Sequence, residues 1–323
     1  MLSRRFAPLA LAFLLAAFAG GLAQEKKDDK KVEKKVEKKA PPVPPIPPTA
    51  ENVSYGPHAR NVLDFWQAKS DKPTPVVFCI HGGGWQGGDK NNYYGRVKTF
   101  LDQGISVASI NYRLMAQANE QKVMPPVKAP LEDAARALQF VRSKAADWNI
   151  DKKRIGATGG SAGGCSSLWL AFHDDMADPK SSDPVSREST RLYCAGVEGA
   201  QVSLDPKELR EWMPNYGYGS HAFGLRNFQA LIDDREKVSK WIKEYSPIEH
   251  ATKDDPPIGL FYGGDKAAKR GDSPKDPTHS PLLGFLLKEK LDKLGVENVL
   301  VYTGHPHPKY KSSRDFLIAH LLK

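Results

Sequence analysis

Runs of apolar residues recur along the chain from about residue 53 to its carboxyl end, separated by polar stretches that contain glycine or proline. Eight runs have the length and the Val, Ile and aromatic content of strands: 53–55, 62–66, 76–80, 105–110, 155–158, 192–197, 258–262 and 299–302. Most of them are continuous rather than alternating, which is typical of strands buried on both faces of a parallel sheet.

Between these runs, apolar residues return every three or four positions, as on one face of a helix, most clearly at 131–141 and 282–291. Alternation of strand and helix predicts an α/β fold with a mostly parallel central sheet of about eight strands and helices on both faces. Ligands of such sheets bind beyond the carboxyl ends of the strands, so the residues that directly follow the strands are the candidates for chemistry.

A serine between small residues, Gly159-Gly160-Ser161-Ala162-Gly163, follows the run 155–158 and precedes an apolar helix. This pattern is typical of a nucleophile elbow, a sharp turn that exposes the serine hydroxyl at the sheet edge. The small flanking residues let strand and helix pack beside the turn. A serine hydroxyl is a poor nucleophile at neutral pH, so we expect a histidine base nearby, oriented by a carboxylate.

A second glycine-rich loop, His81-Gly82-Gly83-Gly84-Trp85, follows the run 76–80. Backbone N–H groups of such a loop can point at the oxygen of a carbonyl under attack and stabilise its negative charge. We expect the amides of Gly83, Gly84 and Ala162 to form this oxyanion hole. Losing one donor of this kind costs about 3 kcal/mol of transition-state stabilisation.

Four motifs together resemble those of the esterase/lipase branch of the alpha/beta-hydrolases, close to the hormone-sensitive-lipase-like and carbohydrate-ester (acetyl or feruloyl) esterases. They are His81 to Trp85, Asn111-Tyr112-Arg113-Leu114, Glu132-Asp133-Ala134 and Gly159 to Gly164. The resemblance covers about residues 53–323 and implies the chain order nucleophile, acid, histidine. It also implies acyl transfer to water through an acyl-enzyme without a metal or organic cofactor, and a structural role for Asp133.

Relatives of this kind carry an aromatic-x-Gly-x-x-His pattern after the last strand, which Tyr302, Gly304 and His307 match. We therefore predict His307 as the base and keep His305 as the alternative. His279 is a third possibility, although it lies in the segment where the acid is expected. A His-x-His pair can also ligate a metal, but no further ligands with suitable spacing accompany it in the sequence.

The acid is expected after the run 258–262, where the chain carries Asp265, Asp272 and Asp276. We predict Asp276, because Asp276-Pro277 precedes the helical segment 282–294 by the interval that is usual in relatives. Asp265 is then a turn or helix-capping carboxylate, and Asp272 remains the second alternative.

Three segments follow one another along the chain. Residues 1–23 combine the basic pair Arg4 and Arg5 with an apolar run at 7–19, which is typical of a secretory signal and too short for a confident membrane span. Residues 24–48 are rich in Lys and Glu and then in Pro, which predicts a charged, solvated stretch followed by a stiff spacer. The alpha/beta-hydrolase domain is expected over 49–323, in a protein that is secreted or periplasmic.

The formal charge of +9 falls largely on the first 39 residues, so the folded part is only mildly basic. We see no basic motif in it that favours nucleic acid. The Lys-rich linker is a solubilising tether or associates weakly with an anionic cell envelope. Cys79, Cys165 and Cys194 are too few for a disulfide framework and are expected as small buried residues, with a Cys165–Cys194 pair left open.

The substrate class is expected to be a small-molecule or carbohydrate ester, such as an acetyl or feruloyl ester of a polysaccharide. The segment 199–224 carries aromatic side chains among glycines, which form either a wall of the site or part of the core: Trp212, Tyr216, Tyr218, His221 and Phe223. Two alternatives remain. One is a serine peptidase of the prolyl-oligopeptidase type, although the chain has no room for the β-propeller usual there, and the other is an inactive binding protein that keeps the elbow.

Overall fold

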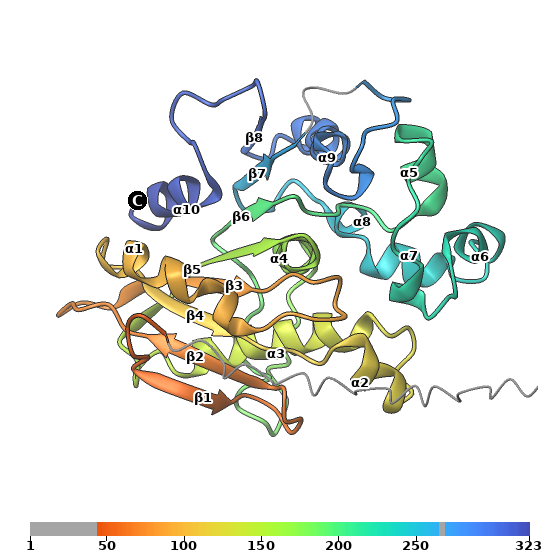
Figure 1. Ribbon diagram of the computed structural model, residues 1–323. Helices are drawn as coiled ribbons and strands as arrows, with labels where there is room; N and C mark the ends of the chain where they lie inside the picture. The colour runs from red at the N-terminus through yellow and green to blue at the C-terminus, as the bar shows by residue number, and fades with distance from the viewer. Residues whose placement is uncertain (1–43, 265–268) are drawn as a thin grey trace, which may run out of the picture. The chain divides into compact units, whose positions relative to one another are not determined.

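The computed structural model describes residues 44–264 and 269–323 (Figure 1). Its core is an eight-stranded sheet in the order β1-β2-β4-β3-β5-β6-β7-β8. The strands are β1 (Ala50–Ser54), β2 (Val62–Trp66), β3 (Thr74–Ile80), β4 (Ser106–Ile110), β5 (Ile150–Gly160), β6 (Cys194–Glu198), β7 (Ile258–Tyr262) and β8 (Asn298–Tyr302). The pairs β1/β2 and β2/β4 are antiparallel and all other pairs are parallel, so the predicted α/β sheet is confirmed.

Helices cover both faces of the sheet, as the alternation of strands and helices predicts. The α-helices are α1 (Val97–Leu101), α2 (Met115–Glu120), α3 (Lys128–Ser143), α4 (Ala162–Phe172), α5 (Pro206–Trp212), α6 (Phe228–Asp233), α7 (Ser239–Tyr245), α8 (Pro247–His250), α9 (Pro281–Leu294) and α10 (Ser313–Leu321). Helices α3, α4 and α9 share one apolar cluster, while α1 and α10 pack in a second cluster on the opposite face (Figure 1).

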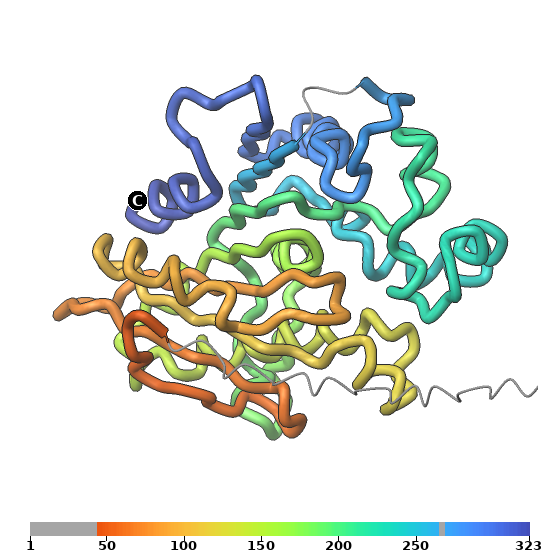
Figure 2. The backbone as a smooth tube through the Cα atoms, viewed as in Figure 1, coloured from red at the N-terminus to blue at the C-terminus, as the bar shows by residue number. Residues whose placement is uncertain are grey.

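Strand β3 shows why its sequence is apolar throughout. Val76, Phe78 and Ile80 point into the cluster with α3 and α4, and Val77 and Cys79 point into the cluster with α1 and α10. Because successive side chains of a strand face opposite sides, a strand covered on both faces needs apolar residues at every position. The tube in Figure 2 passes from β1 and β2, in orange, at one edge of the sheet to β7 and β8, in blue, at the other.

The structure describes only the last residues of the amino-terminal segments that the sequence predicts. The predicted signal at 1–23 and the linker up to residue 43 lie outside the described residues. The end of the proline-rich stretch packs onto the sheet, because Ile46 contacts the second cluster and its carbonyl oxygen accepts a 2.8 Å hydrogen bond from Trp66 Nε1. Packed structure therefore begins a few residues before Thr49.

Two further points follow from the residues that the structure describes. All three cysteines are free thiols and buried, so the pairing of Cys165 with Cys194 does not occur. No helix within 44–264 or 269–323 has both the length and the apolar character required to cross a bilayer.

Candidate functional site

Ser161 lies at the turn between β5 and α4, with φ 53° and ψ −125°, in a region that a residue with a side chain rarely adopts. Its backbone N–H donates to the carbonyl oxygen of Glu198 on β6 at 2.9 Å. A Cβ on Gly163 would lie 2.1 Å from the carbonyl oxygen of Ile80, so only glycine allows α4 to approach β3 this closely. The turn has the geometry of the predicted nucleophile elbow.

The hydroxyl of Ser161 contacts a histidine, and that histidine contacts a carboxylate. Ser161 Oγ lies 3.0 Å from His279 Nε2, and His279 Nδ1 lies 2.8 Å from Asp276 Oδ2. With Asp276 ionised, Nδ1 carries the proton and donates to it, which leaves the lone pair of Nε2 to accept from the serine O–H. The arrangement can therefore withdraw a proton from Ser161.

Asp276 and His279 lie on one short segment after β7. The 3₁₀ turn η3 (Pro277–His279) has Asp276 as its N-cap, and Asp276 Oδ1 accepts from the backbone N–H of Thr278 at 3.1 Å. A Pro at the first position of a turn has its backbone angle already set, which favours this conformation. Two residues separated by three positions in such a turn point to the same side, so the carboxylate and the imidazole meet.

Side chains from the segment after β6 hold this loop over Ser161. Gln201 Nε2 donates to the carbonyl oxygen of Thr278 at 2.8 Å, and Asn215 Nδ2 donates to that of Pro274 at 2.7 Å. The ring of His279 packs on the backbone at Gly199, where a Cβ would meet its Cδ2 at 3.4 Å.

The charge state of Asp276 suits this arrangement. Partial burial alone would raise the pKa of the Asp276 carboxyl. The hydrogen bond from His279, the charge of the imidazolium and the backbone N–H groups of His279 and Thr278 outweigh that effect and hold the pKa below its ordinary value. Asp276 is therefore ionised at neutral pH and can fix the tautomer of His279.

The structure does not bring His307 or His305 to Ser161. The prediction that one of them is the histidine beside the serine is therefore wrong. Gly304, with φ 88°, turns the chain back at once, and the His305 N–H donates to the Tyr302 carbonyl at 2.9 Å. His305 stacks on Tyr302, while His307 stacks on Tyr310 and its Nδ1 accepts from the backbone N–H groups of Lys309 and Tyr310. Both rings are used locally in the turn after β8.

Of the three candidate acids, Asp276 is the one beside a histidine at the site. Asp272 Oδ2 accepts from the backbone N–H of Lys269 at 2.6 Å and closes a turn instead. Asp265 lies outside the described residues. The signal that would have identified His279 is the spacing Asp-Pro-x-His, in which the proline starts a turn and places acid and base on one side of it.

The glycine loop lies directly against the elbow. A Cβ on Gly82 would be 2.5 Å from the carbonyl oxygen of Gly160 and 3.6 Å from Ser161 Cβ. Among the described residues, none accepts a hydrogen bond from the amides of Gly83, Gly84 or Ala162. These three N–H groups are therefore unpaired within the described part of the chain.

The motif residues around the loop are structural supports. His81 is buried and stacks on Tyr112 at 4.1 Å, and the Tyr112 hydroxyl donates to the His81 carbonyl at 2.7 Å. Burial lowers the pKa of His81 to about 4, so its ring is neutral at pH 7. Arg113 makes a bidentate ion pair with Asp133, which has the structural role expected of it.

The aromatic segment after β6 divides between core and site. Trp212, Tyr216 and Phe223 are buried in the apolar core. Tyr218 and His221 are half-buried and cover Gly84: His221 Nε2 donates to the Gly84 carbonyl oxygen at 3.0 Å, and a Cβ on Gly84 would meet the Tyr218 hydroxyl at 2.4 Å. The aromatic wall therefore consists of two side chains over the glycine loop.

The surroundings of Ser161 are open and polar. A cavity of about 250 Å³ next to the elbow is lined by the glycine loop and by the ion pair of Arg96 with Glu198, whose shorter contact is 3.0 Å. The side chains of His279 and Asp276 are 44 % and 61 % exposed. The imidazole and the carboxylate are therefore accessible from solvent.

Comparison with known proteins gives one family. The family model BD-FAE matches residues 63–269, which include the glycine loop and the elbow and end before Asp276. Two curated relatives are the probable isoprenylcysteine alpha-carbonyl methylesterase ICMEL1 of Arabidopsis thaliana, 26 % identical over 272 residues, and the esterase LipQ of Mycobacterium tuberculosis, 32 % identical over 221 residues. The matches cover 81 % and 66 % of this chain but 51 % and 48 % of the relatives, so the chain spans about half their length.

A solved structure has the same architecture. The acetyl ester-xyloside bifunctional hydrolase from Caldicellulosiruptor lactoaceticus is 25 % identical, with a TM-score of 0.56 over 76 % of this chain and 78 % of that one. The fold expected from the strand and helix pattern is thus found in a hydrolase of known structure.

Proposed function

Because the chain belongs to the BD-FAE family of alpha/beta-hydrolase esterases, we propose that it is a serine esterase that hydrolyses small carboxylic esters through an acyl-enzyme. The observation that carries the proposal is the continuous chain of hydrogen bonds from Ser161 through His279 to Asp276. A nucleophile within reach of a base that is itself oriented by a carboxylate is the arrangement such chemistry needs.

In the proposed first step, Ser161 Oγ attacks the ester carbonyl carbon while His279 Nε2 takes the serine proton. Asp276 stabilises the imidazolium that forms. The tetrahedral intermediate collapses when His279 returns the proton to the leaving alcohol, and the acyl group remains on Ser161. Water, activated by the same imidazole, then releases the carboxylic acid and restores the serine.

The oxyanion of the intermediate is proposed to lie against the free amides of Gly83, Gly84 and Ala162. Donors that are already fixed in place stabilise developing charge without reorganisation, and each is worth about 3 kcal/mol. The packing of Gly82 and Gly163 against neighbouring backbone supports such fixed positions.

For the substrate, we propose an acetyl or feruloyl ester on a polysaccharide. Three observations support this class: the open position of His279 and Asp276, the two aromatic side chains over the glycine loop, and a structural neighbour that is an acetyl ester-xyloside hydrolase. A bulky chain needs an accessible serine, and aromatic rings pack well against sugar or phenolic rings. Secretion or a periplasmic location, expected from residues 1–23, agrees with such a substrate.

A fluorophosphonate probe tests the proposed chemistry, because it labels only a serine that a neighbouring base activates. We expect labelling of the wild type, none of Ser161→Ala and strongly reduced labelling of His279→Ala. His307→Ala should be labelled like the wild type. An unlabelled wild-type protein would instead favour an inactive relative.

The substrate class is tested by rates on p-nitrophenyl acetate, acetylated xylan and methyl ferulate. We expect at least one of the last two to be hydrolysed with a higher kcat/KM than the p-nitrophenyl ester. Equal, low rates on all three would exclude a polysaccharide ester while leaving the serine chemistry intact.

A further inference from the structure

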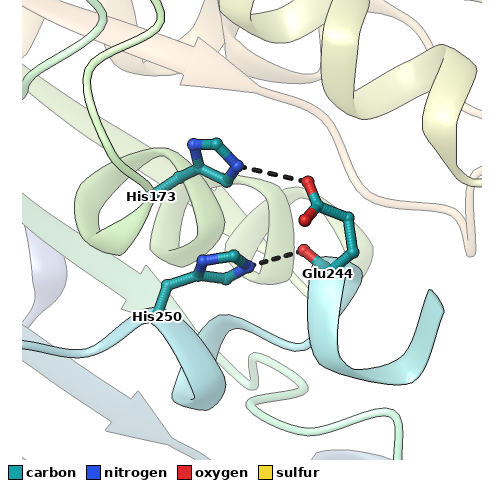
Figure 3. Close-up of side chains that lie close together, drawn as sticks. All are labelled: His173, Glu244 and His250. Atoms are coloured by element: carbon teal, nitrogen blue, oxygen red, sulfur yellow. Dashed lines mark hydrogen bonds and ion pairs between the residues drawn. The ribbon is translucent and has the colours of Figure 1, made fainter. Parts of the chain in front are cut away.

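Two histidines and a glutamate meet at the end of α4 remote from Ser161 (Figure 3). His173 is the C-cap of α4, Glu244 lies on α7, and His250 is the last residue of α8. One possible ligand atom from each side chain lies within 4.8 Å of those from the other two. The His173 Nε2 and Glu244 Oε1 atoms are 3.2 Å apart, and the two imidazole centroids are 4.7 Å apart.

Backbone carbonyls fix one nitrogen of each ring. His173 Nδ1 donates to the Asp174 carbonyl oxygen at 2.9 Å, and His250 Nε2 donates to the Glu244 carbonyl oxygen at 2.6 Å. In its neutral form His173 Nε2 then carries a lone pair toward Glu244, whereas the His250 nitrogen toward Glu244 is Nε2, whose proton is donated to the Glu244 carbonyl oxygen (Figure 3). The His173 lone pair faces the carboxylate of Glu244, a contact that becomes attractive when a proton or a metal ion lies between the two atoms.

We propose that His173, Glu244 and His250 form a binding site for a divalent transition-metal ion of the Zn²⁺ type, which joins α4 to the α7–α8 segment. Two imidazoles and one carboxylate, with a water molecule completing a tetrahedron, are a donor set that suits Zn²⁺. Donation of the second ring nitrogen to a backbone carbonyl, as His173 Nδ1 donates to Asp174, is the usual support of a metal-bound histidine, and His250 would exchange its hydrogen bond to the Glu244 carbonyl for a bond from Nε2 to the ion.

The distances fit this ion after a small adjustment. Zn²⁺ binds nitrogen and carboxylate oxygen at about 2.0–2.2 Å, so tetrahedral ligand atoms lie about 3.3 Å apart. His173 Nε2 and Glu244 Oε1 already have nearly this separation, and the ligand atoms of all three side chains lie within 4.8 Å of one another, so the third would have to move closer by at most about 1.5 Å.

The site is structural rather than catalytic. Ser161 and His173 cap the two ends of α4 and are 12 positions apart, so His173 lies about 18 Å along the helix from Ser161. An ion there would hold the carboxyl end of the helix that begins at the elbow. We therefore expect it to change thermal stability and to leave ester hydrolysis unaffected, independently of the proposed function.

The test uses the full chain, stripped with EDTA and titrated with Zn²⁺ by calorimetry, with Co²⁺ absorption as a readout of tetrahedral coordination. We expect one ion per chain and a rise in Tm of about 5 °C at a Zn²⁺ concentration a hundred times the Kd. Glu244→Gln, which preserves side-chain shape, should weaken binding by about tenfold or more, and so should His173→Gln.

Two controls separate this site from other histidines. The double variant His305→Gln/His307→Gln and the variant His279→Ala should both bind the ion like the wild type. The proposal is overturned if the wild type binds no more tightly than Glu244→Gln, or if binding is lost in either control, since the ion would then lie after β8 or beside Ser161.

Discussion

Neighbouring backbone atoms pack directly against Gly163 and the glycine loop and leave no space for a Cβ, whereas Asp276 and His279 lie 61 % and 44 % exposed on a loop held by two side-chain hydrogen bonds. The family model covers the first region and ends before the second. The comparison teaches that the groups proposed to bind the oxyanion are constrained by backbone packing, while the groups proposed to transfer the proton depend on a local turn and on the side chains that hold it over the serine.

The largest effect is expected for the histidine. His279→Ala should lower kcat by about 10⁴-fold or more, because Ser161 loses its base, while His307→Ala should change kcat less than twofold. Steady-state rates on p-nitrophenyl acetate measure both. A large loss of kcat in His307→Ala, with none in His279→Ala, would support His307 as the base, as the sequence predicts. It would contradict the proposed role of His279.

Asp276→Asn is expected to reduce kcat by about 10⁴-fold, since an amide favours the wrong tautomer of His279. Asp272→Asn is the matched control from the same loop and should keep nearly full activity. Circular dichroism of both variants checks that the fold is unchanged. Equal activity of the two variants would show that Asp276 does not orient the base.

For the packed region, Gly163→Ala should lower the free energy of unfolding by about 3 kcal/mol, because the added Cβ would lie 2.1 Å from the Ile80 carbonyl oxygen. Gly95→Ala is the control, since nothing lies within 4 Å of its added Cβ. Urea unfolding measures both. A harmless Gly163→Ala would mean that the elbow is less constrained than the contacts indicate.

The pH dependence of stability tests the support of the glycine loop. The pKa of His81 is lowered from 6.5 to about 4, so below pH 6.5 the unfolded chain binds a proton that the folded chain does not. Stability is therefore lost as pH falls from about 6.5 to about 4, with a slope from this residue of at most about 1.4 kcal/mol per pH unit.

Replacing His81 by Asn should remove that slope, so the difference in unfolding free energy between wild type and His81→Asn should shrink on acidification. Urea titrations at pH 7, 6 and 5 measure it. His307→Gln should keep the slope of the wild type, and a constant difference for His81→Asn would contradict the assignment.

The smallest effect on kcat is expected for His221, whose ring donates a hydrogen bond to the glycine loop. His221→Phe removes the hydrogen bond to the Gly84 carbonyl, which is worth about 1 kcal/mol, so kcat should fall several-fold with little change in KM. Tyr218→Phe keeps the ring and serves as the control. A change in KM alone would indicate that His221 contacts the substrate rather than positioning the loop.

The sheet, the elbow and the glycine loop were predictable from the sequence because each depends on local patterns: continuous apolar runs for buried strands, and small residues where backbones meet. The choice of Asp276 among the acids of this loop was also possible from the sequence, because a proline follows it and a helix comes next, and in the structure this carboxylate lies beside a histidine. Such features can be predicted without knowing which distant segments of the chain come together in the fold.

The histidine was not predictable in the same way. His307 matches the spacing seen in relatives, but the turn at Gly304 and the amides of Lys309 and Tyr310 bind its ring locally. Whether a ring reaches Ser161 depends on the path of the loop, which a spacing does not specify. The metal-site residues show the same difficulty, because only the tertiary packing of α4 against α8 brings His173 and His250 together.

Because carboxylate and imidazole share a single turn, their mutual alignment is set within four residues, and no residue after β8 takes part in it. The segment between β8 and α10 therefore does not have to supply the histidine beside Ser161, although the spacing of its own histidines had suggested that role. It can be lengthened, shortened or given a different surface in an engineered protein, and turnover should persist as long as β8 still closes the edge of the sheet.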